Sequence, residues 1–297
     1  MNEKVASVIA RIPGWAGAGD LTAEPLAGLT NTNYCVKVGG ERFVLRVAGD
    51  NAALLGINRE WERQALLAAA QVGIGPEVVS FLLPEGHLVT RYIEGRHWTS
   101  AEYRTQENLQ RIVATVKNLH ALPAVRATFS PFQRVEAYAR QARSFGVPFP
   151  QDFGILMQKM EAIAEIQRQD RDPWLCFCHN DLYWVNVLDD GRVRFVDWEF
   201  AGMGDLYFDL ATLVYSHESD GPLSEELEET LLGCYFGQVR PKHRTRLQGM
   251  KYMLHFFTAM WAMLQSGMQS TGMVPQVDGF DYFRYAEGTF AEMRRIL

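Results

Sequence analysis

The strand-forming residues of this chain lie mostly in its first third, and this uneven distribution constrains the fold more than any other feature. Residues 34–38 and 42–47 are rich in β-branched and aromatic side chains and flank two glycines, a pattern typical of a β-hairpin. Two further short apolar runs, 77–83 and 87–93, flank a second turn. We therefore expect residues 20–94 to contain a small antiparallel sheet.

Helical patterns dominate the rest of the chain. Asn58 can cap a helix over 59–71, which would pack against the sheet and end before a Gly-Ile-Gly-Pro turn. Beyond residue 95, helical segments are expected near 109–119, 132–145, 152–168, 224–236 and 245–266, interrupted by one hairpin over 185–196. The pattern predicts an α+β chain with a β-rich lobe, 1–94, and a larger, mainly helical lobe, 95–297.

Charge and hydropathy exclude several classes of partner. The net charge of −6 over 297 residues comes without a basic stripe, so we expect no nucleic acid partner. No stretch approaches the ~20 apolar residues of a membrane helix, and residues 1–11 lack the apolar run of a signal peptide. We therefore expect a cytoplasmic protein without a membrane partner.

The cysteines give no sign of a disulfide framework or a metal site. Cys35, Cys176, Cys178 and Cys234 have neither the spacing of metal ligands nor the density of a small disulfide-bonded domain. Reduced thiols are the expectation. His120, after a long helix, is expected to be a core or helix-end histidine.

The main chemical motif is His179-Asn180-Asp181-Leu182-Tyr183-Trp184-Val185-Asn186, followed by an apolar strand that ends in Asp197. Phosphoryl transfer from ATP requires a carboxylate to accept the proton of the attacking hydroxyl, and Asp181 fits this role. It also requires oxygen ligands for Mg2+, and Asn186 and Asp197 fit that role. The hairpin between them would bring both side chains together. His179 is expected to steady the loop.

Other polar residues fit the binding of ATP. The turn containing Gly28, Thr30 and Asn31 can approach phosphate oxygens, although an ordinary hairpin turn is the alternative. Arg46 is a lone cation in an apolar strand and can clamp the α- and β-phosphates, oriented by a carboxylate of the next helix. Glu60 and Glu62 are both candidates for that carboxylate, and Glu62 is preferred.

Two further acidic residues, Glu199 and Asp209, are candidates for a role near this motif. Glu199 follows Asp197 by two residues, so it is a further candidate Mg2+ ligand, with a solvated carboxylate as the alternative. Asp209 is expected to brace the catalytic loop through its backbone amides.

The chain resembles the choline/ethanolamine kinase family, within the protein-kinase-like group that includes the aminoglycoside phosphotransferases. The resemblance covers roughly residues 20–290 and rests on these stretches: 28–34, Leu45-Arg46-Val47, 73–76, His179-Asn180-Asp181 with Asn186, 196–199, 208–211, His255-Phe256-Phe257 with Trp261, and Phe280-Asp281-Tyr282 with Tyr285-Ala286. It implies a bilobal protein-kinase-like fold with ATP and Mg2+ between the lobes. Homodimers occur among members of the family, so a homodimer is an expectation of the resemblance.

Aromatic residues are candidates for the substrate pocket. A quaternary ammonium group is held by aromatic faces and nearby carboxylates. The resemblance assigns Trp261 and Tyr285 to this pocket, although an aromatic stripe on a helix usually belongs to the core. Tyr183 and Trp198 flank the catalytic carboxylates and are further candidates, with packing as the alternative. Thr258 stands where eukaryotic relatives place another pocket tryptophan.

The expected activity is an ATP-dependent small-molecule kinase. It would transfer the γ-phosphate to a hydroxyl of an amino alcohol such as choline or ethanolamine, with Asp181 contacting that hydroxyl. Thiamine and aminoglycosides are alternative acceptors, and a nucleotide-binding pseudokinase is the alternative outside the enzymes. The three oxygen-bearing residues Asp181, Asn186 and Asp197 argue against a pseudokinase, which does not need all of them.

Overall fold

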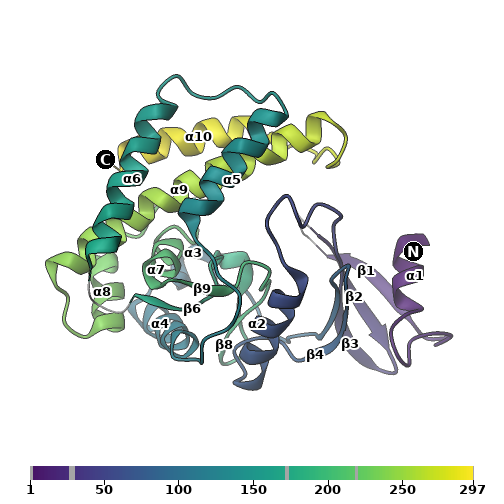
Figure 1. Ribbon diagram of the computed structural model, residues 1–297. Coiled ribbons are helices and arrows are strands. Elements are labelled where there is room, and N and C mark those ends of the chain that lie inside the picture. The colour runs from purple at the N-terminus through teal and green to yellow at the C-terminus, as the bar shows by residue number, and fades with distance from the viewer. Residues whose placement is uncertain (1–2, 27–30, 171–173, 218–219, 297) are drawn as a thin grey trace.

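The computed structural model describes residues 3–26, 31–170, 174–217 and 220–296. A five-stranded antiparallel sheet, in the order β1-β2-β3-β5-β4, lies at one end of the molecule (Figure 1). Its strands are β1 (Thr22–Leu26), β2 (Thr32–Val38), β3 (Glu41–Val47), β4 (Val78–Leu82) and β5 (His87–Arg91). The hairpin expected at Gly39-Gly40 joins β2 to β3, and both glycines have positive φ, as the tight turn requires.

The central strand β3 presents different residues to the two faces of the sheet. Phe43, Leu45 and Val47 are buried in a cluster with helix α1 (Glu3–Ile9), which covers the outer face. Because side chains alternate along a strand, Arg46 points to the opposite face. That face is directed toward helix α2 (Arg59–Gln71), so the guanidinium of Arg46 is a buried cation on this side of the sheet.

Helix α2 (Arg59–Gln71) lies between the sheet and the helical part of the molecule (Figure 1). Asn58 caps it as expected: its side chain accepts the backbone N–H of Trp61 at 3.1 Å. Ala65, Leu66 and Ala69 bury one stripe of the helix in the main core. Glu62 lies in the first turn, where it faces the sheet.

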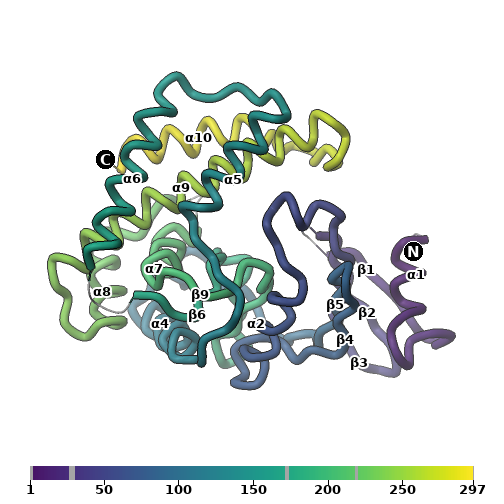
Figure 2. Tube along the Cα trace, in the orientation of Figure 1, coloured from purple at the N-terminus to yellow at the C-terminus, as the bar shows by residue number. Residues whose placement is uncertain are grey.

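The remainder of the chain is mainly helical. Its helices are α3 (Ser100–Tyr103), α4 (Gln106–His120), α5 (Pro131–Ser144), α6 (Phe153–Gln169), α7 (Leu206–Val214), α8 (Glu225–Phe236), α9 (Pro241–Ser270) and α10 (Tyr282–Arg295). The long helix α9 contacts α5, α7 and α10, and the tube trace shows these helices gathered away from the sheet (Figure 2).

Two small strand pairs position the catalytic loop inside the helical part. Strands β6 (Leu175–Cys178) and β9 (Gly202–Asp205) pair antiparallel, and so do β7 (Val187–Asp189) and β8 (Val193–Phe195). A 3-10 turn, η1 (Trp184–Asn186), connects the catalytic loop to β7. The second pair is the hairpin expected over 185–196.

The expected α+β bilobal architecture is confirmed, with a small antiparallel sheet and a larger helical part. Within the described residues, none of the helices combines the length and the apolar character that a bilayer-crossing segment needs.

Candidate active site

The loop that follows strand β6 is held in place by hydrogen bonds to neighbouring segments of the chain. Asp209, in the first turn of α7, is fully buried and accepts the backbone N–H groups of His179 at 2.9 Å and Asn180 at 2.6 Å. The side chain of Asn180 donates to the carbonyl oxygen of Phe200 at 3.0 Å. These contacts hold Asn180 at a φ of 66°, which a non-glycine residue rarely adopts. The expected bracing role of Asp209 is confirmed.

His179 supports the loop and is held in its neutral form. Its Nε2 lies 3.0 Å from the carbonyl oxygen of Val196, which follows β8. Complete burial lowers the pKa of His179 to about 4, although Asp209 acts in the opposite direction. A neutral imidazole that donates to a carbonyl joins the loop to the end of β8, which agrees with the scaffold role expected of this residue.

Asp181 and Asn186 are joined directly. The side-chain amide of Asn186 donates to both the carbonyl oxygen and Oδ2 of Asp181, each at 2.8 Å. Asn186 is buried in the short turn before β7, while Asp181 is half-buried. The amide therefore fixes the orientation of the Asp181 carboxylate, as an acceptor for a substrate proton requires.

The hairpin brings Asn186 and the residue before Asp197 together. Val187 pairs with Phe195 across the hairpin, and the backbone N–H of Val196 donates to the carbonyl oxygen of Asn186 at 3.0 Å. The sequence pattern predicted this approach of Asn186 and Asp197. The three motif residues thus lie on one loop-and-hairpin unit.

Asp197 is in a strained and electrostatically unfavourable position. Its φ is 63°, and its Oδ1 atom is buried without a hydrogen-bond partner among the described residues. Burial raises the pKa of its carboxyl well above the usual range, the charges of Glu199 and Asp181 add to this, and Arg46 opposes it. A buried, unpaired carboxylate oxygen among other carboxylates fits the binding of a divalent cation, because hard cations prefer oxygen ligands.

A buried ionic network connects the sheet to this carboxylate cluster. Arg46, 6% exposed, forms an ion pair with Glu62 and donates to the carbonyl oxygen of Gly86 at 2.9 Å. The preference for Glu62 over Glu60 as the ion-pair partner of Arg46 is therefore confirmed. Glu60 instead bonds Arg63 at 2.8 Å on the helix surface.

Arg59 is a residue of the candidate site that the sequence pattern did not reveal. Its Nη1 lies 2.7 Å from Glu62 and 3.1 Å from Glu199, and it is buried. The side chain of Asn31 donates to the same Glu199 oxygen at 3.0 Å. The spacing of Arg59 and Glu62 by three residues on a helix is a local signal that could have suggested half of this network.

The network affects two predicted site residues. Glu199 is engaged through Oε2 by Arg59 and Asn31, so its contacts here are those of an ion-pair partner, and its Mg2+ role stays a prediction. Asn31 is buried at the edge of the predicted phosphate-binding turn. Gly28 and Thr30, predicted to contact phosphate, lie outside the described residues.

The predicted substrate aromatics are in different environments. Trp198 is 2% exposed, donates from Nε1 to Phe195 O at 3.0 Å and packs edge-on against His179, so packing is the role that its contacts show. Tyr183 is half-buried, and its hydroxyl lies 3.3 Å from the hydroxyl of Thr258 on α9. The catalytic loop therefore touches α9 one turn before Trp261.

Trp261 and Tyr285 belong to one aromatic cluster at the junction of α9 and α10. Both are partly buried. Trp261 contacts Tyr282 edge-on with ring centroids 5.6 Å apart, Tyr282 contacts Phe280, and Phe280 contacts Tyr285 at 5.3 Å. Leu254, Phe257 and Leu264, at helical spacing from Trp261 on α9, are buried, so part of this stripe of side chains is core.

Comparison with known proteins identifies the class to which this fold and site belong. A family model described as the phosphotransferase enzyme family matches residues 22–245. The chain belongs to this family.

Its relatives include named kinases. Protein LicA of Haemophilus influenzae is 32% identical over 228 residues, which cover 75% of this chain and 65%, slightly less than two thirds, of that protein. A probable choline kinase of Arabidopsis thaliana is 24% identical and aligns over 92% of this chain and 86% of its own length. The crystal structure of a choline/ethanolamine kinase family protein from Mesorhizobium loti has a TM-score of 0.79, with 26% identity over 99% of this chain and 93% of that one.

Proposed function

We propose that this protein is an ATP-dependent kinase that transfers the γ-phosphate of ATP to the hydroxyl of an amino alcohol, choline or ethanolamine. The observation that carries the proposal is the hydrogen-bonded pair of Asp181 and Asn186, set on the hairpin that ends at Asp197. This arrangement supplies an oriented carboxylate beside oxygen ligands for a metal-bound triphosphate. Membership of the phosphotransferase family supports the same reaction class.

Asp181 acts on the acceptor. Its carboxylate, held by the Asn186 amide, would accept a hydrogen bond from the substrate hydroxyl and align the oxygen with the γ-phosphorus. As the oxygen attacks, the proton passes to the Asp181 carboxylate. Most of the acceleration would come from positioning, since this reaction asks little covalent chemistry of the protein.

Asn186 and Asp197 would hold Mg2+, with Glu199 as a further candidate, and the ion would neutralise charge on the β- and γ-phosphates when bound. Arg46, oriented by Glu62, would bind the α- and β-phosphates. Asn31 would contact the phosphates, and the same contact is proposed for Gly28 and Thr30. Arg59 keeps Glu62 and Glu199 together, so it would position both carboxylates for this site.

The acceptor would bind between the catalytic loop and the end of α9. Trp261 and Tyr285 would offer aromatic faces to its amino group, and Tyr183 would lie beside Asp181. Buried Trp198 would support the loop from behind. Aminoglycosides are the less favoured acceptor, because the named relatives are choline and ethanolamine kinases.

The wider organisation follows from this reaction. Residues 1–94 would form the ATP-binding lobe and residues 95–297 the catalytic and substrate-binding lobe. The use of ATP and the free thiols favour a cytoplasmic location. A homodimer remains an expectation from the family resemblance.

A panel of acceptors tests the substrate class. We expect choline or ethanolamine to be phosphorylated with a kcat/KM at least about tenfold above that of thiamine or an aminoglycoside, because an aromatic pocket suits a small ammonium group and not a bulky polar one. The measurement is a coupled assay of ADP release with mass detection of the phosphorylated product.

The control is ADP release without any acceptor, which must be subtracted. A higher kcat/KM for thiamine or an aminoglycoside would contradict the proposed acceptor. If no alcohol in the panel acquired phosphate, the pseudokinase alternative would replace the kinase.

A further inference from the structure

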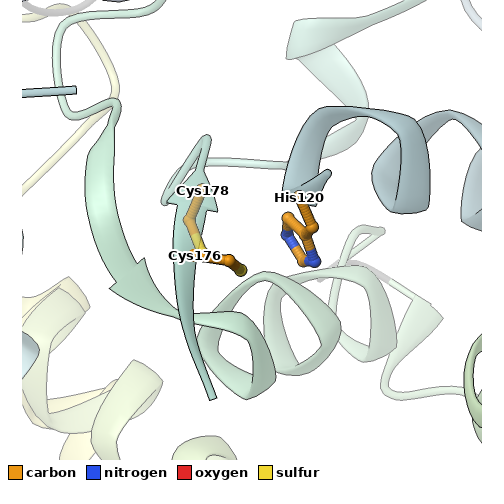
Figure 3. A group of neighbouring side chains, drawn as sticks. All are labelled: His120, Cys176 and Cys178. Carbon is orange, nitrogen blue, oxygen red and sulfur yellow. The ribbon is translucent and has the colours of Figure 1, made fainter. Parts of the chain in front are cut away.

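Three side chains with soft donor atoms converge behind the catalytic loop. Figure 3 shows Cys176 and Cys178 on strand β6 and His120 at the end of helix α4, with their side chains directed toward one another. One ligand atom from each residue lies within 4.8 Å of the others. The sequence did not indicate this cluster, because His120 lies 56 positions before Cys176 and no metal-ligand spacing includes it.

We propose that His120, Cys176 and Cys178 form a binding site for a thiophilic divalent metal of the Zn2+ class, separate from the ATP and Mg2+ site. Two sulfur donors and one imidazole nitrogen are typical zinc ligands, whereas Mg2+ prefers oxygen. Three protein ligands leave the fourth position of the tetrahedron to water.

The separation of the sulfurs matches zinc coordination. Their distance is 3.6 Å. Two sulfurs bound to one tetrahedral zinc at about 2.3 Å lie about 3.8 Å apart, so the thiols need to move by only a few tenths of an ångström. The imidazole nitrogen must approach from within the observed 4.8 Å to about 3.5 Å from each sulfur. A rotation of the His120 side chain that releases one of its hydrogen bonds would provide this.

A disulfide fits the same residues less well. Residues two apart in a strand have Cα atoms about 6.6 Å apart, near the upper end of the range of about 4.4 to 6.8 Å that disulfides span. Cys176 and Cys178 are on a strand paired to β9, which opposes the bending that would shorten this distance. The thiols therefore suit a shared metal better than a bond to each other.

The surroundings of His120 supply one outer partner for a metal-bound imidazole and one group that the metal must displace. Its side chain is 4% exposed, with Nδ1 2.7 Å from the Tyr235 hydroxyl and Nε2 3.0 Å from Asp209 Oδ2. Because both ring nitrogens have a partner, a metal must displace Tyr235 or Asp209 from one of them, while the other nitrogen keeps its hydrogen bond and holds the imidazole in place. Asp209 also holds the catalytic loop, so the metal would link α4 and β6 immediately behind it.

Cobalt binding tests the site without reference to kinase activity. The full-length protein, stripped with a chelator and kept reduced, is titrated with Co2+. We expect one equivalent to give the intense sulfur-to-cobalt charge-transfer absorption of thiolate ligands, and one equivalent of Zn2+ to remove it. Co2+ at the proposed Mg2+ site has oxygen ligands and gives no such band. We also expect Zn2+ to raise the melting temperature.

Cys176→Ser is the main variant, because Cys176 is only partly buried, and Cys234→Ser is the matched control outside the cluster. The band must disappear in the first variant and persist in the second. Should Cys176→Ser fail to fold, zinc-edge X-ray absorption of the wild-type protein decides: two sulfurs at about 2.3 Å and one nitrogen support the site.

Three spectroscopic results would overturn the proposal. They are a spectrum of Co2+ without sulfur ligation, a band that survives in Cys176→Ser, and a zinc shell made of oxygen and nitrogen alone. A disulfide would replace the proposed site if the metal-free protein, exposed to air, rapidly lost two titratable thiols and the mass of two hydrogen atoms.

Discussion

Replacing Asp181 by asparagine is expected to lower kcat by about 10²- to 10⁴-fold, the range that a positioned proton acceptor contributes. Asparagine has the same shape and can keep one hydrogen bond to Asn186, but its amide cannot take up the proton of the substrate hydroxyl. Asp181 is half-buried, so the fold should persist. Steady-state kinetics with choline and ethanolamine measure kcat, and fluorescence titration measures the affinity for ATP, which should change little.

Asp190→Asn is the matched control for this change. Asp190 lies in the turn of the same hairpin, where its side chain, 21% exposed, forms an ion pair with Arg194 at 3.1 Å. Its replacement should leave kcat within a factor of about two, since surface pairs contribute little. A kcat for Asp181→Asn close to that of the wild type would remove Asp181 from the mechanism.

Replacing Asp197 by asparagine is expected to separate stability from activity. Burial raises the pKa of the Asp197 carboxyl well above its ordinary value, and Glu199 and Asp181 add repulsion, so the charged form is costly in the folded state at neutral pH. The unfolded state has no such cost, so a neutral amide should raise the melting temperature of the nucleotide-free protein. The same change removes a proposed Mg2+ ligand, so kcat should fall by about 10³-fold or more.

Differential scanning calorimetry without nucleotide and kinetics over a series of Mg2+ concentrations test the two halves of this prediction. The melting temperature should rise while the activity stays low at every Mg2+ concentration. A variant that melts lower and retains full activity would show that Asp197 stabilises the fold and binds no metal. Asp190→Asn again serves as the control.

The local elements could be predicted from the sequence because their signals are local. The hairpin of β2 and β3 is marked by its two glycines, and α2 begins and ends at the predicted residues because Asn58 caps it and Gly73 follows it. The hairpin of β7 and β8 was found for the same reason.

Elements that depend on distant partners were missed. Strand β9 reads Gly-Met-Gly-Asp, which has low strand propensity, and it forms because β6 pairs with it across more than twenty residues. Helix α7 is buried on all sides, so its sequence lacks the separate polar and apolar faces whose periodicity identifies a helix. Helix α10, beyond the periodic segments, packs on α9.

The same distinction applies to the candidate site. Asp181, Asn186 and Asp197 could be identified because the motif and its hairpin are continuous in the sequence. The contacts of Arg59 with Glu199 and Asn31 could not be, because these partners lie 140 and 28 positions away, and only its pairing with Glu62 is local. Trp198 is next to Asp197 in the sequence, yet it turns into the core, and sequence proximity alone could not distinguish a packing role from a substrate contact.

A crystal structure of the protein with Mg2+, a non-hydrolysable ATP analogue and choline tests most directly whether three side chains converge on one metal-bound triphosphate. We expect the side-chain oxygens of Asn186 and Asp197 at about 2.1 Å from Mg2+, and the Asp181 carboxylate within about 3.2 Å of the choline hydroxyl. Mg2+ bound away from Asn186 and Asp197, or a choline hydroxyl beyond the reach of Asp181, would contradict the proposed site.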